Sequence, residues 1–88
     1  DVGVAYRENT DEVVEVLKTV AAELAEDEAF APDLAGEFEV LGVDAFADSA
    51  VTIRVRQRTQ PGKQWRIKRE LLRRIKLRFD ELGIEIPF

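Results

Sequence analysis

The chain has 88 residues, of which 45% are hydrophobic and 35% are charged. This length allows one small domain with a single core, and the composition is too apolar for a disordered chain. The sequence contains no Cys and no His. Disulfide bonds, Cys/His metal sites, thiol redox chemistry and catalysis by an imidazole are therefore excluded.

Charge is divided unevenly along the chain, although the net charge is only −5. Residues 1–50 carry 14 acidic and 2 basic side chains, and residues 51–88 carry 4 acidic and 11 basic side chains. The first part thus has a charge of −12 and the second a charge of +7. This separation of charge is the most unusual feature of the composition.

The chain begins with Asp1 rather than Met and ends on an apolar stretch at Phe88, so we expect it to be a fragment of a longer protein. Its apolar runs are far shorter than the ~20 residues that cross a bilayer. No charged segment followed by an apolar one resembles a signal peptide. The 88 residues are expected to be soluble.

A short strand and a helix are predicted first. Val2, Val4 and Tyr6 alternate with smaller or polar residues, which predicts a strand over residues 1–7. Thr10 is a suitable N-cap for an amphipathic helix that ends at about Glu26. The apolar face of that helix is expected to hold Val13, Val14, Leu17, Val20, Ala21 and Leu24.

A loop and a hairpin are predicted next. Residues 27–36 have no period and contain Pro32 and Gly36, which indicates a loop with a short turn around Phe30. The apolar parity changes at Gly42, which predicts a β-bulge in the strand that follows. Residues 47–50 then connect tightly to a regular strand over residues 51–56, whose polar face would carry Thr52, Arg54, Arg56 and Arg58.

A second helix follows the break at Pro61 and Gly62, and Gly83 is placed to end it as a C-cap residue. Its predicted apolar stripe, with the single tryptophan in the core, consists of Trp65, Leu71, Leu72, Ile75, Phe79 and Leu82. Residues 84–86 alternate before Pro87 and predict a short edge strand.

The predicted order β-α-β-β-α-β is the ferredoxin-like arrangement of an α+β protein. Right-handed connections would place two helices on one face of a four-stranded antiparallel sheet, with the first and third strands central. Residues 1–88 are expected to form this single domain.

No catalytic, cofactor-binding or metal-binding residue is assigned from the sequence. The carboxylate groups follow no calcium-loop pattern and are interpreted as solvated surface; they are Glu26–Asp27–Glu28, Glu37 with Glu39, and Asp44 with Asp48. Ser49 has no base beside it and is interpreted as a turn residue. Pro61-Gly62-Lys63 is far from a phosphate-binding loop and is expected to separate a strand from a helix.

The basic residues of the second helix leave two hypotheses open. Arg66, Arg69, Arg73 and Lys76 form one stripe, with Lys68, Arg74 and Arg78 nearby, which is typical of a surface that binds nucleic acid or other anions. Recognition of RNA on the sheet is not favoured, because residues 51–57 carry no aromatic side chain. Alternatively, the basic helix faces acidic residues, either within one subunit or between subunits; those expected on the first helix are Asp11, Glu12, Glu15, Glu23 and Glu26.

Several segments resemble the C-terminal cytoplasmic domain of small-conductance mechanosensitive channels of the MscS type. They are residues 1–6 (DVGVAY), 40–56 (VLGVDAFADSAVTIRVR), 61–65 (PGKQW), 68–71 (KREL) and 83–88 (GIEIPF). The resemblance extends over essentially the whole chain in matching order. The loop over residues 27–36 is the part least like that family.

This resemblance implies a non-enzymatic vestibule domain below the pore of a membrane channel, on the cytoplasmic side of the inner membrane. In the family such domains assemble as a homoheptamer and form a cage through which ions and small solutes pass during osmotic stress. The implied partners are copies of the same chain, with no cofactor and no nucleic acid. A third alternative, an enzyme of the acylphosphatase kind with Arg7 in a phosphate loop, lacks the expected glycine-rich surroundings.

Overall fold

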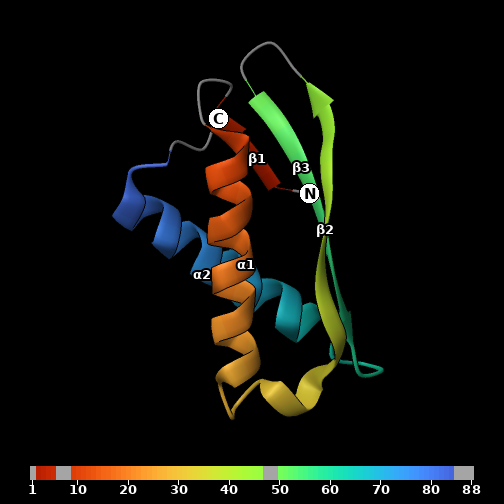
Figure 1. Cartoon of the computed structure of the whole chain (residues 1–88). Coiled ribbons are helices and arrows are strands. Elements are labelled where there is room, and N and C mark those ends of the chain that lie inside the picture. The colour runs from red at the N-terminus through yellow and green to blue at the C-terminus, as the bar shows by residue number, and fades with distance from the viewer. Residues whose placement is uncertain (1, 6–8, 47–49, 85–88) are drawn as a thin grey trace.

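The computed structural model describes residues 2–5, 9–46 and 50–84. Two helices lie on one side of an antiparallel sheet (Figure 1). In chain order the elements are β1 (Val2–Ala5), α1 (Thr10–Glu26), the short 3₁₀ helix η1 (Ala31–Asp33), β2 (Leu34–Phe46), β3 (Ala50–Thr59) and α2 (Gln64–Leu82). The predicted α+β class, with its two helices and its hairpin, is confirmed.

The three described strands have the order β1-β3-β2, and both pairings are antiparallel. Val2 pairs with Ile53 and Val4 with Val51, so β1 covers only the first part of β3. The fourth strand predicted over residues 84–86 lies outside the described residues apart from Ile84. The described structure therefore contains both helices and the first three strands of the predicted sheet.

Helix α1 begins one residue earlier than expected. The Asn9 side chain accepts hydrogen bonds from the backbone N–H groups of Asp11 (3.0 Å) and Glu12 (3.2 Å). Asn9 is thus the N-cap, and the prediction of Thr10 was wrong. Both residue types cap helices well, so their order in the sequence does not decide between neighbours. The predicted end of the helix at Glu26 is confirmed.

The predicted loop over residues 27–36 is partly regular structure. Hydrogen bonds from the backbone N–H groups of Phe30 and Ala31 to the Asp27 carbonyl close a turn at the expected place. Strand β2 then begins at Leu34, which pairs with Thr59. Backbone pairing with β3 extends the strand over residues that turn propensity assigns to a loop.

The predicted β-bulge is confirmed. Gly42 has φ +107°, and the register of β2 against β3 shifts between Val40 and Gly42. A positive φ of this size favours glycine because it has no Cβ. The shift accounts for the change of apolar parity along β2.

The core lies between the two helices and the inner side of β3. Its fully buried members are Val13, Leu17, Val20, Leu24, Ile53, Ile67 and Phe79, with Val51, Leu71 and Ile75 nearly so. The predicted core position of Trp65 is wrong, because its side chain is 63% exposed. Leu72 and Leu82 are also exposed, whereas Ile67, which the predicted stripe left out, is buried.

Helix geometry explains this error. The buried residues of α2 recur every four positions from Ile67 to Phe79. Trp65 precedes Ile67 by two residues and therefore points about 200° away from it around the helix.

Among the described residues, no helix combines the length and apolar character that a membrane span requires.

Candidate functional site

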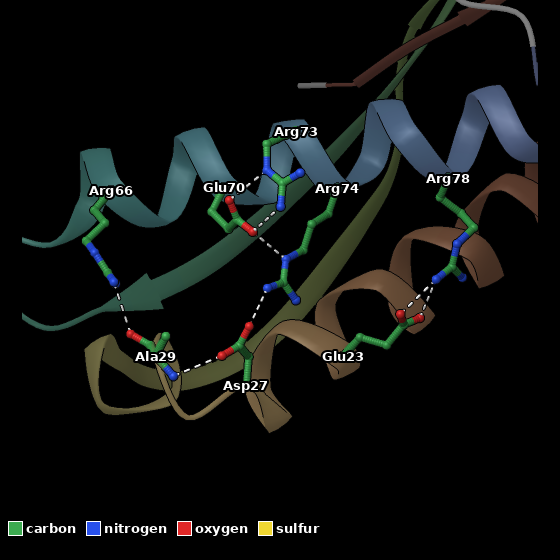
Figure 2. A network of polar contacts seen from close by, with 8 residues as sticks. All are labelled: Glu23, Asp27, Ala29, Arg66, Glu70, Arg73, Arg74 and Arg78. Carbon is green, nitrogen blue, oxygen red and sulfur yellow. Dashed lines mark hydrogen bonds and ion pairs between the residues drawn. The ribbon is translucent and has the colours of Figure 1, made fainter.

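The most distinctive polar feature is a row of arginines on α2 that contacts the acidic first part of the chain (Figure 2). We call Arg66, Arg74 and Arg78 the arginine row. With Glu70 they are spaced four residues apart, so they follow one side of the helix. Their acidic partners lie on α1 and in the segment that joins α1 to β2.

The two end members of the arginine row contact different segments of the acidic half of the chain. An Arg78 guanidinium nitrogen donates to both carboxylate oxygens of Glu23 on α1, each at 2.7 Å. Arg66 forms an ion pair with Asp33 and donates to the carbonyl oxygen of Ala29 at 3.1 Å. The row therefore joins α2 to α1 and to the turn that follows it.

Asp27 is the central partner and is held from two sides. Its Oδ1 accepts from the backbone N–H of Ala29 at 2.9 Å, and its Oδ2 accepts from Arg74 Nη2 at 2.6 Å (Figure 2). The hydrogen bond from Ala29, followed by that from Arg74, lowers the pKa of Asp27 below its usual value. The carboxylate is thus stabilised in its charged form at the end of α1.

Glu70 bridges two neighbouring arginines on α2. Arg73 donates to both of its oxygens at 3.0 Å, and Arg74 Nε donates to one of them at 2.7 Å. These bonds, from Arg73 first and then from Arg74, lower the pKa of Glu70. Glu70 also orients Arg74, whose other end reaches Asp27, so the two carboxylates share one guanidinium.

Phe30 lies close to two cations of the arginine row. The guanidinium carbon of Arg66 is 4.2 Å from the centre of its ring, and that of Arg74 is 5.4 Å away. Both distances fall within the range of cation–π contacts. The turn after α1 is thus bound to α2 through an aromatic ring as well as through carboxylates.

The predicted pairing of acidic and basic halves within one subunit is present, but mostly with other partners. Of the five acidic side chains expected on the first helix, Glu23 contacts α2 in the part of the chain that is described. Asp27 and Asp33 are the other two partners, although Asp27 was assigned to solvated surface. The sequence signal for these contacts is a charged residue at every fourth position from Arg66 to Arg78. The predicted stripe instead continues from Arg66 through Arg69 and Arg73.

Most residues of the predicted basic stripe form ion pairs with acidic side chains of the same chain. Arg66 contacts Asp33, Arg73 contacts Glu70, and Lys76 contacts Asp80 at 2.9 Å. Arg69 has no ion pair within residues 9–46 and 50–84, and Lys68 lies over the Trp65 ring at 5.4 Å.

The other candidate residues do not form a site. No group of three or more Asp or Glu residues in the described part of the chain is arranged to hold a metal ion. Glu39 forms an ion pair with Arg56 at 2.7 Å across the hairpin. The predictions on Arg7, Asp48, Ser49 and the side chain of Asp44 lie outside what the structure describes.

Comparison with known proteins gives a consistent family. Residues 1–86 match the family model described as "Mechanosensitive ion channel MscS, C-terminal". The chain is 34% identical over 80 residues to the moderate conductance mechanosensitive channel YbiO of Escherichia coli (strain K12), which covers 91% of this chain and 11% of that protein.

Two further relatives each match more than nine tenths of this chain. A small-conductance mechanosensitive channel of Caldanaerobacter subterraneus subsp. tengcongensis is 31% identical over 81 residues, or 92% of this chain and 28% of that protein. An uncharacterized MscS family protein of Archaeoglobus fulgidus is 34% identical over 87 residues, or 99% of this chain and 29% of that protein. The chain thus spans less than a third of the length of each of these relatives.

Proposed function

This chain belongs to the MscS family of mechanosensitive channels, and from that premise we propose that it is a vestibule domain on the cytoplasmic side of such a channel. In this role it contributes to assembly of a cage of identical subunits and to passage of ions and solutes through that cage. The match to the C-terminal family model over residues 1–86 is the observation that carries the proposal.

The proposed role is structural and electrostatic rather than catalytic. The arginine row forms ion pairs with three carboxylates of the acidic half. Other acidic side chains of that half remain exposed, among them Glu12 and Glu26. Charges that line a cage or its openings raise the local concentration of counter-ions and so bias permeation. The surplus negative charge of residues 1–50 would thus act on permeating cations.

The proposed complete fold is the ferredoxin-like one. Among the described strands, β1 has a neighbour on one edge, which is β3. A strand over residues 84–86 beside β1 would cover the other edge and give the order expected from the sequence.

Recording from the full-length channel tests this function. We expect membrane patches that contain it to carry tension-activated current, and cells without other mechanosensitive channels to survive osmotic downshock when they express it. Deletion of this domain should lower both the amount of assembled protein and cell survival. A protein that reaches the membrane and carries no current at any tension would refute the proposal.

A further inference from the structure

One flank of α2 presents exposed apolar side chains with an arginine between them. Trp65 is 63% exposed and Leu72 is 47% exposed. Leu72 follows Trp65 by seven positions, which is about two helical turns, so both side chains lie on the same flank. Arg69 lies between them on that flank, and no acidic residue in the described part of the chain pairs with it. We call Trp65, Arg69 and Leu72 the α2 ridge.

A separate hollow lies between α1 and β2. It is open to the surface and has a volume of about 330 Å³. Its lining is largely apolar and includes Ala22, Ala25, Leu34 and Phe38, and its charged lining residues are Lys18 and Glu37. Glu37 has no basic partner among the described residues, whereas Lys18 lies 3.7 Å from a carboxylate oxygen of Glu15. We call this feature the α1–β2 hollow.

We propose that the α2 ridge of one subunit docks into the α1–β2 hollow of a second copy of this chain. The two surfaces suit each other in shape, because the ridge carries exposed bulky side chains and the hollow is lined in part by the small residues Ala22 and Ala25. Arg69 and Glu37 both lack a partner within the described chain and can pair across the contact, while Lys18 of the hollow already has Glu15 as its partner. Aromatic and arginine side chains are the residue types most enriched at the centres of protein interfaces.

The geometry of this contact determines the type of assembly. Ridge and hollow are different surfaces of the same molecule, so the contact is head-to-tail rather than two-fold symmetric. Head-to-tail contacts close into rings when the rotation between neighbours permits it. The inference rests on the proposed function, since it names the surface through which the cage domains meet.

Cross-linking in the full-length channel tests the contact. Because this chain has no Cys, the pair Trp65→Cys and Ala22→Cys introduces two defined thiols once any cysteines elsewhere in the channel are replaced by serine. We expect oxidation to give a series of disulfide-linked multimers, and each single variant to give none beyond a dimer. The control pair Leu77→Cys and Ala22→Cys should give no series, since Leu77 is similarly exposed but lies on another flank of α2.

Charge exchange tests the same contact without a covalent bond. Arg69→Glu should lower the yield of the multimer series several-fold, because it places two acidic side chains together. Combining Arg69→Glu with Glu37→Arg should restore the yield. A failure of this rescue would argue against the Arg69–Glu37 pairing that orients the contact.

The assembly state separates this inference from the proposed function. If the channel forms a ring, as measured by native mass spectrometry, and the Trp65–Ala22 pair does not cross-link, the docking surface is wrong while the proposed function stands. If the series forms but the channel carries no tension-activated current, the proposed function fails while the contact stands. A full-length protein that remains monomeric would overturn both.

Discussion

Asn9 sets the start of α1, and its contribution can be separated from that of its neighbour. Replacing Asn9 with Ala removes the acceptor of two backbone N–H groups and should lower the free energy of unfolding by about 1 kcal/mol. Thr10→Ala is the matched control and should change it by less than about 0.5 kcal/mol. Urea denaturation of the 88-residue chain measures both. A larger effect at Thr10 would contradict the assignment of the cap.

Ile67 and Trp65 are two residues apart and should respond to substitution in opposite ways. Ile67→Ala opens a cavity in the core and should cost about 2–5 kcal/mol of unfolding free energy. Trp65→Ala removes a mostly exposed side chain and should cost less than about 1 kcal/mol in the monomer. Urea denaturation at low protein concentration gives both values. A cost at Trp65 equal to that at Ile67 would place the indole ring in the core.

These residues show where sequence patterns reach their limit. Hydrophobic period alone identified all the buried positions of α1, because Val16 is the one large apolar residue of the described helix that lies outside the stripe. In α2 the apolar residues Trp65, Leu72 and Leu82 lie at spacings that also suit a helical stripe, although packing leaves them exposed. A surface that binds another subunit resembles a core in composition, so the sequence does not distinguish the two.

At the scale of elements, the contact between α2 and the acidic turn should make stability depend on pH. The pKa values of Asp27 and Glu70 are lowered in the folded state. Each therefore contributes stability that is fully present above its unfolded pKa, near 4, and that is lost as pH falls through the folded pKa. We expect the free energy of unfolding to decrease as the pH is lowered below about 4.

A pair of isosteric variants attributes part of this dependence to the central carboxylate. Asp27→Asn keeps an oxygen that can accept from the Ala29 N–H but cannot gain a proton, so its stability should change less with pH in the acid range. Glu28→Gln is the control, because Glu28 has no ion pair in the described structure. Urea denaturation at a series of pH values measures the slopes. An unchanged acid slope for Asp27→Asn would show that this carboxylate does not contribute.

The elements also show why the site was only partly predictable. The separation of acidic and basic halves indicated that they would meet, and the contact of Arg78 with Glu23 confirms a pairing of the two helices. The partners Asp27 and Asp33 follow from how residues 27–36 fold. That segment forms a turn, a 3₁₀ helix and the start of β2, which local propensity predicted as loop. Its shape is set by pairing of Leu34 with Thr59, a contact distant in sequence.

At the scale of the whole molecule, intramolecular ion pairs reduce the attraction of the basic half for other anions. The net charge is −5, and the arginine row is bound to carboxylates of the same chain. Exposed ion pairs add little stability, about 0–1 kcal/mol each. Their larger effect here is to occupy guanidinium groups that would otherwise contact phosphate or sulfate. The −12/+7 separation therefore does not by itself make the protein a nucleic-acid binder.

Chromatography on heparin tests this conclusion directly. The 88-residue chain should pass through the column at neutral pH and about 50 mM salt, a condition under which phosphate-binding proteins are retained. The triple variant Glu23→Gln, Asp27→Asn and Asp33→Asn leaves Arg66, Arg74 and Arg78 without these partners and changes the net charge from −5 to −2. It should be retained and then released as the salt concentration rises, because binding through phosphate-like groups weakens with salt.

A control with the same net charge separates the arginine row from charge in general. Asp11→Asn, Glu12→Gln and Glu15→Gln also give −2 but leave the row paired, so this variant should pass through the column. Equal retention of the two triple variants would mean that net charge alone governs binding. Retention of the unmodified chain would instead support the anion-binding hypothesis. Passage of the unmodified chain and of the control, with retention of the first variant, would show that the acidic half holds the basic helix in a form unavailable to nucleic acid.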